Sequence, residues 1–194
     1  GAANSGDDVT WWENDGTPSD GGWNQHTIDP DLEEAWYVRA ADIDEDGDID
    51  VVAAGKGAGG TSGKIKWYIN DGSPDDDDWT AVQIDNNIYD AMCVRIVDID
   101  LDGDLDVLTF SILGVFVEYH KNQSMELYGN CDSLIFEFSE SCWGLFYEGL
   151  NSYILNCQNC QCPQVNSNYN AKQKHAGSTI LAIDIDNDND KDLI

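Results

Sequence analysis

Short alternations of polar and apolar residues run along the chain and predict β-strands. Residues 64–69 alternate in this way, and the Asn-Asp-Gly run at 70–72 marks the turn that follows. Residues 79–84, 91–97 and 106–110 are predicted as three further strands. No helical periodicity of any length accompanies them. The pattern therefore predicts an all-β protein built from short strands and tight turns.

The sequence also repeats itself at an offset of 56 residues. The run Trp11–Gly16 recurs as Trp67–Gly72, and Val38-Arg39 recurs as Val94-Arg95. Four short strands in a unit of this length are typical of a four-stranded antiparallel blade of a β-propeller. A third copy of the acidic part begins at Asp184, 86 residues after Asp98 and thus 30 more than the offset. We therefore expect propeller blades with an insertion before the third acidic segment.

Composition divides the chain into three predicted parts. Residues 1–110 contain two Asp-rich repeats, and residues 178–194 begin a further, truncated repeat. Residues 111–177 are rich in Cys, Asn, Gln and Phe, and are predicted as an insertion or a divergent blade. Three acidic segments are too few to close a propeller, which usually has about four to eight blades. The sequence thus predicts a partial propeller, a fragment of a longer protein.

Three acidic nonapeptides are the candidate chemistry. Each carries five aspartates at alternate positions, and these fifteen residues are the candidate metal ligands: Asp42, Asp44, Asp46, Asp48 and Asp50; Asp98, Asp100, Asp102, Asp104 and Asp106; Asp184, Asp186, Asp188, Asp190 and Asp192. Five carboxylates in one tight loop repel one another unless a cation neutralises them. Ca²⁺ takes about six to eight oxygen ligands. The spacing therefore predicts a calcium loop in each nonapeptide.

Position 6 of each nonapeptide supports this interpretation. Gly47 and Gly103 permit the sharp turn that brings a backbone carbonyl toward the ion from position 7. Asn189 replaces the glycine in the third copy, where we expect weaker binding. The loops are not EF-hands, which have twelve residues, a final Glu and flanking helices. The alternative is a solvated acidic turn that binds no metal.

Aspartate loops of this form, each running into an apolar strand, resemble the FG-GAP (VCBS-like) repeats of integrin-α-type β-propellers. The resemblance covers residues 8–110 and 176–194, although the Phe-Gly and Gly-Ala-Pro words of the family are not intact. It implies one structural calcium ion for each loop, about three in all. It also implies side-chain ligands at positions 1, 3, 5 and 9, and backbone carbonyl ligands at position 7, from Asp48, Asp104 and Asp190.

Net charge and missing motifs exclude several functions. Nine basic and 38 acidic residues give a net charge of −29, which argues against nucleic-acid binding and against docking on anionic membranes. No apolar run is long enough for a transmembrane helix. None of the three histidines lies in a catalytic motif, and the paired carboxylates that a glycosidase would need are better explained as calcium ligands. We expect no enzymatic activity.

The expected function is a secreted or cell-surface calcium-binding scaffold for protein binding or adhesion. One alternative is a lectin-like propeller in which Trp side chains stack on sugars instead of packing within blades; the recurring residues are Trp11, Trp12, Trp23, Trp67 and Trp79. The other is a non-catalytic propeller module of a larger secreted hydrolase or lyase. The partner would accordingly be an extracellular protein or a glycan.

Six cysteines favour an oxidising compartment. Five lie in one segment: Cys131, Cys142, Cys157, Cys160 and Cys162. Disulfides are the preferred interpretation, and the odd number leaves one cysteine over. The alternative is a zinc site made from Cys157, Cys160 and Cys162, with His175 as the fourth ligand. Cys93 lies in a predicted core strand and is expected to be a buried free thiol.

Overall fold

The structure is a computed structural model of the whole chain, and its described residues have several gaps. They are residues 1–3, 6–57, 62–76, 78–88, 91, 93–110, 115–132, 134–149, 152–157, 160, 181–186, 188 and 191–193. No helix in this part of the chain is long and apolar enough to cross a membrane.

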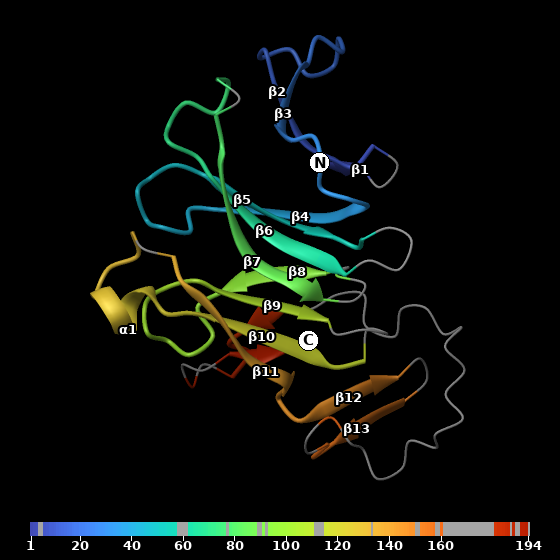
Figure 1. Ribbon diagram of the computed structural model, residues 1–194, viewed down its shortest axis with the longest axis vertical. Coiled ribbons are helices and arrows are strands. Elements are labelled where there is room, and N and C mark those ends of the chain that lie inside the picture. Colours follow the sequence, from blue (N-terminus) through green and yellow to red (C-terminus); the bar gives the residue numbers. More distant parts are fainter. Residues whose placement is uncertain are drawn as a thin grey trace.

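The fold is all-β, as predicted, and two four-stranded antiparallel sheets form its centre (Figure 1). The first has the order β4-β5-β6-β7, with β4 (Ala35–Ala41), β5 (Asp50–Gly55), β6 (Gly63–Ile69) and β7 (Thr80–Ile88). The second has the order β8-β9-β10-β11, with β8 (Val94–Val97), β9 (Asp106–Phe110), β10 (Val117–Asn122) and β11 (Phe136–Trp143). Strands that are consecutive in the sequence are neighbours in each sheet, which is the arrangement of a propeller blade.

Smaller elements flank the two blades. The sheet β1-β2-β3 comprises β1 (Ala2–Ala3), β2 (Asp8–Glu13) and β3 (Asn24–Asp29), and lies beyond β4 in Figure 1. Two hairpins pair β12 (Phe146–Gly149) with β13 (Ser152–Leu155), and β14 (Ala182–Ile183) with β15 (Asp192–Leu193). The short helix α1 (Ser124–Tyr128) lies between β10 and β11 in the chain. The described sheets do not close into a ring.

The hydrophobic core lies between successive sheets. Side chains of a strand point alternately to its two faces. On β5, Val52 and Ala54 belong to the cluster that includes Val94 and Val107 of the second blade. Val51 and Ala53 belong instead to the cluster that includes residues of β2 and β3. Every residue of β5 is buried. A central strand covered on both faces is therefore apolar throughout, except for the aspartate with which it begins.

All four predicted strands exist, but they do not share one sheet. Residues 64–69 and 79–84 lie in β6 and β7, whereas 91–97 and 106–110 contribute to β8 and β9 of the next blade. A 56-residue period does not say where one blade ends and the next begins, so grouping these strands into one blade was wrong.

The second blade draws half of its strands from the segment predicted as an insertion or divergent blade. Strand β10 pairs with β9 through Val117 and Phe110, and β11 pairs with β10 through Trp143 and Val117. Residues 111–177 therefore supply the outer two strands of this sheet.

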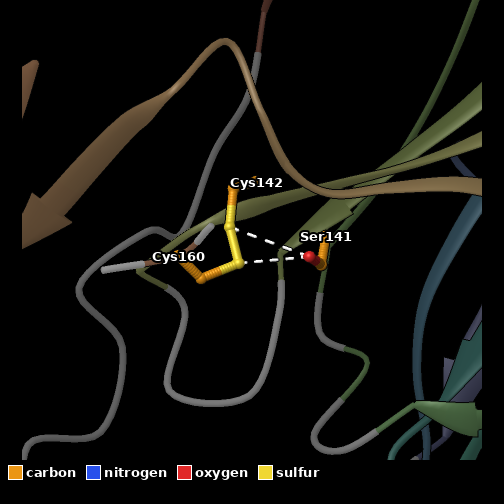
Figure 2. Close-up of a disulfide and its surroundings, with 3 residues drawn as sticks. All are labelled: Ser141, Cys142 and Cys160. Carbon is orange, nitrogen blue, oxygen red and sulfur yellow. Dashed lines mark hydrogen bonds between the residues drawn. A yellow bond between two sulfur atoms is a disulfide. The ribbon is translucent and has the colours of Figure 1, made fainter. Parts of the chain in front are cut away.

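A disulfide joins Cys142, at the end of β11, to Cys160 (Figure 2). The hydroxyl of Ser141 lies 3.1 Å from the Cys160 sulfur. Cys157 is disulfide-bonded as well. The predicted disulfides are confirmed for these cysteines, and the zinc alternative is wrong because zinc requires free thiolates. Cys162 and His175 lie outside the described residues.

Two free cysteines are found among the described residues, Cys93 and Cys131. Cys93 is buried, as expected, and its exposed fraction is 1%. Cys131 is buried as well.

We expect Cys142→Ser to free one thiol and to destabilise the chain. The bridge closes a loop of 18 residues, and such a bridge contributes about 3 kcal/mol through the entropy of the unfolded chain. Thiol labelling of the unfolded, non-reduced protein should count two or fewer thiols in the wild type and one more in the variant. Urea unfolding would give the change in the free energy of unfolding. An unchanged thiol count would contradict the bridge.

Candidate metal centre

The three acidic loops occupy equivalent places in the fold. Residues 42–49 connect β4 to β5, residues 98–105 connect β8 to β9, and residues 184–191 connect β14 to β15. In the first two loops the residue at position 2 is buried, Ile43 at 1% exposed and Ile99 at 9%. Each of these isoleucines packs in the core beside its blade. Each of these two loops is therefore anchored to the core by one apolar side chain at position 2.

The backbone of the first two loops turns in the same way. Gly47 and Gly103 at position 6 have φ values of +102° and +104°, which agrees with the predicted sharp turn. Position 4 is also left-handed, with φ +60° at Glu45 and +63° at Leu101. This second left-handed position was not predicted, because neither residue type favours it.

Carboxylates converge within each loop. Three groups have ligand oxygens that all lie within 4.8 Å of one another: Asp42, Asp44 and Asp46; Asp98, Asp100 and Asp106; Asp184, Asp186 and Asp192. Oxygen ligands at such separations suit a hard cation. These three groups bring together nine of the predicted ligands, three from each loop.

Position 9 holds each loop to the adjoining strand. The Asp50 carboxylate accepts hydrogen bonds from the backbone N–H of Ile43 at 3.1 Å and of Asn70 at 2.9 Å. Asp106 accepts the same two bonds, from Ile99 at 3.2 Å and Asn122 at 2.9 Å. In the third loop Asp192 accepts from Ile185 at 2.9 Å. The last aspartate is therefore a structural acceptor in all three loops, a role that ligand spacing did not predict.

The chemistry of the donor set fits a calcium ion. Oδ1 of Asp42, Asp98 and Asp104 is buried and has no hydrogen-bond partner. A buried polar atom in this condition costs free energy unless something else contacts it. Burial, with the charges of nearby aspartates, raises the pKa of Asp44 to about 6. Burial likewise raises the pKa of Asp104 to about 6. A cation among these oxygens would offset both costs.

The second loop has partners from outside its nonapeptide. Asp104 accepts a hydrogen bond from the backbone N–H of Met125 in α1 at 3.0 Å. Glu126, also in α1, forms a further carboxylate group with Asp100 and Asp102. Lys121 of β10 makes ion pairs with these same three carboxylates. Glu126 and Lys121 were missed by the sequence analysis, since neither lies in the repeated motif.

Two further predicted residues donate backbone hydrogen bonds within their own loops. The half-buried Asp48 donates its backbone N–H to Asp46 at 2.9 Å, and Asp188 donates to Asp184 at 3.2 Å. Neither belongs to a converging group of the described residues. Asp190, predicted to give a backbone carbonyl, lies outside the described residues.

An asparagine beyond each of the first two loops was also missed. The amide Nδ2 of Asn70 donates to the Ile49 carbonyl at 3.2 Å, and that of Asn122 donates to the Leu105 carbonyl at 3.4 Å. Asn70 directly follows β6, and Asn122 is the last residue of β10. An Asn three residues after an aromatic residue recurs at Trp67 and Tyr119 and was a usable signal.

A family-model comparison decides how the central segment is classified. Residues 42–109 match the model of the FG-GAP-like repeat. This segment is an FG-GAP-like repeat. The match begins at the first residue of the first acidic loop and ends in β9, after the second loop. The FG-GAP-like repeat therefore contains both loops whose carboxylates converge. No curated protein and no solved structure matches the chain.

Proposed function

We propose that the chain is an extracellular β-propeller module whose loops bind calcium and whose blades serve as a scaffold for protein binding or adhesion. The convergence of carboxylates at the same place in three loops is the observation that carries the proposal. In the first loop, Asp42, Asp44 and Asp46 would hold the ion. Calcium supplies positive charge to a site that already contains orphaned buried oxygens. Its role would be structural.

The chain's own residues position the ligands. Asp50 directly follows the first loop, and it accepts hydrogen bonds from Ile43 near the start of the loop and from Asn70, which follows β6. The buried Ile43 packs in the core and anchors the start of the loop there. The loop is thus organised before any ion binds, which lowers the ordering cost of binding.

An extracellular setting agrees with two features. The Cys142–Cys160 disulfide is of a kind that persists in oxidising compartments. Modules outside cells can use weak calcium sites, with Kd of the order of 10⁻⁴–10⁻³ M. No catalytic role is proposed for any residue, because the acidic groups are accounted for as metal ligands and as backbone acceptors.

The test is a thermal melt with calcium and with EGTA, together with calorimetric counting of bound ions. About three ions per chain are expected, one for each loop. A site with calcium about twentyfold above its Kd contributes about 2 kcal/mol. Asp44→Ala should remove one ion from the count. A melt indifferent to EGTA would show that the loops are solvated turns and would overturn the proposal.

Carbohydrate binding is the second candidate, and exposed tryptophans favour it. Trp12 and Trp23 are 47% and 43% exposed. Trp67, by contrast, is 1% exposed and belongs to the core, as blade packing predicts. A glycan array probed with the calcium-loaded chain would test this candidate, and a Trp12→Ala variant that keeps full binding would count against it.

A further inference from the structure

The second loop contains a positive charge within its carboxylates. Nζ of Lys121 lies 3.1 Å from Oδ2 of Asp102 and contacts the carboxylates of Asp100 and Glu126 still more closely. The ligand oxygens of these three acids all lie within 4.8 Å of one another. Only 20% of the Lys121 side chain is exposed. The ammonium is therefore held among three carboxylates.

The equivalent position of the first blade is apolar. In that blade Val51 pairs with Tyr68, and in the second blade the corresponding Val107 pairs with His120. The next residue along each strand is therefore Ile69 in β6 and Lys121 in β10. Ile69 packs against the core between the blades and has no charge to offer the first loop. The two loops, so alike in their nonapeptides, differ in the strand beside them.

We propose that Lys121 is an internal cation of the second loop, which makes this loop a weaker calcium site than the first. The inference rests on the proposed calcium-binding function and concerns how that function is divided between the loops. A calcium ion entering the second loop either displaces the ammonium from Asp100 and Asp102 or binds close to its charge. Both routes reduce affinity, because like charges repel and because ion pairs must be broken.

The same contacts stabilise the second loop without metal. Lys121 neutralises one of the negative charges that gather there, and Glu126 links the cluster to helix α1. The N–H of Met125, in the same helix, donates to the buried Asp104. The first loop has five aspartates and Glu45 in nine residues, and Ile69 is its counterpart to Lys121. Calcium removal should therefore disturb the first loop more than the second.

The experiment is a calorimetric titration of the metal-free full chain with Ca²⁺, combined with thermal melting in EGTA. Lys121→Met keeps the length of the side chain and removes its charge. Lys64→Met is the matched control, because Lys64 lies at the opposite end of β6 from the loop. Ile69→Lys is the converse change in the first blade.

Lys121→Met should lower the Kd of one of the weaker steps, that of the second loop, about tenfold. It should leave the tight step of the first loop and the step of the third loop unchanged, and it should lower the metal-free melting temperature. Lys64→Met should change each Kd less than twofold. Ile69→Lys, if folded, should weaken the tight step. If every weaker-step Kd in Lys121→Met lay within twofold of its wild-type value, the inference would be overturned. A metal-free melting temperature equal to that of Lys64→Met would overturn it too.

Failure of the proposed function gives a different result. In that case the wild type shows no calcium binding in any loop. The internal-cation role is then decided by the metal-free melts alone, in which Lys121→Met must still be less stable than Lys64→Met.

Discussion

Asp50→Ala should lower the free energy of unfolding by about 2–3 kcal/mol, whether or not calcium is present. The Asp50 side chain is fully buried, and its two oxygens accept from the backbone N–H groups of Ile43 and Asn70. Truncation leaves both donors buried and unpaired, and each unpaired donor costs about 1–3 kcal/mol. Burial raises the pKa of Asp50, so the charge itself has a cost, and relief of this cost limits the net loss. Urea unfolding in EGTA and in calcium would measure the effect.

Asp46→Ala is the matched control within the same loop. Asp46 is exposed, and its carboxylate accepts only one hydrogen bond of those described, from the N–H of Asp48. We expect a loss below about 0.5 kcal/mol in EGTA, because surface changes of this kind are small. In calcium the loss should grow, since a ligand is missing. If Asp46→Ala and Asp50→Ala were equally destabilising in EGTA, the structural role assigned to position 9 would be wrong.

Glu118→Gln should stabilise the chain at pH 8 by about 2 kcal/mol and have little effect at pH 4. Burial, and then the charge of Asp85, raises the pKa of Glu118 to about 7 in the folded state. The unfolded value is about 4.5. Above pH 7 the folded chain therefore bears the full cost of a buried charge, and this cost disappears as the pH falls from about 7 to 4.5. Gln keeps the size of the side chain and has no charge to bury.

Glu140→Gln is the control for this prediction. Glu140 is exposed on β11, so its substitution should change stability by less than about 0.5 kcal/mol at either pH. Only the difference between each variant and the wild type is compared, so the titration of the acidic loops cancels. A Glu118→Gln gain that stayed constant from pH 8 to pH 4 would contradict the raised pKa.

Repetition made most of the fold predictable. Alternating strands, the turn glycines and the fifteen aspartates could all be read because the same pattern occurs two or three times. The residue at which one blade ends and the next begins could not be predicted, because a repeat of 56 residues is the same wherever it is taken to start. The boundary between the two sheets falls between β7 and β8. The two sheets share a core cluster that includes Val52, Val94 and Val107, and no local pattern encodes this packing.

The candidate site was predictable only where its residues are adjacent in the sequence. Ligand spacing located the loops, and the structure places three carboxylates together in each. Lys121 and Glu126 come from another strand and a helix, and they reach the second loop only after β10 has paired with β9. The family resemblance implied a side-chain ligand at position 9, whereas in the second loop two buried backbone N–H groups donate to that carboxylate.

The hydrogen bonds of Asp50 also have a consequence for folding fidelity. Asp50 begins β5, and side chains of a strand alternate between two faces. A slip of β5 by one residue would turn this carboxylate away from Ile43 and Asn70, and would place Ile49 or Val51 against two bare N–H groups. A strand of small, similar apolar residues, Val-Val-Ala-Ala, has little else to distinguish neighbouring alignments. Asp50 therefore favours the native register of β5 over registers shifted by one residue. Asp106 makes the same hydrogen bonds and has the same effect in the second blade.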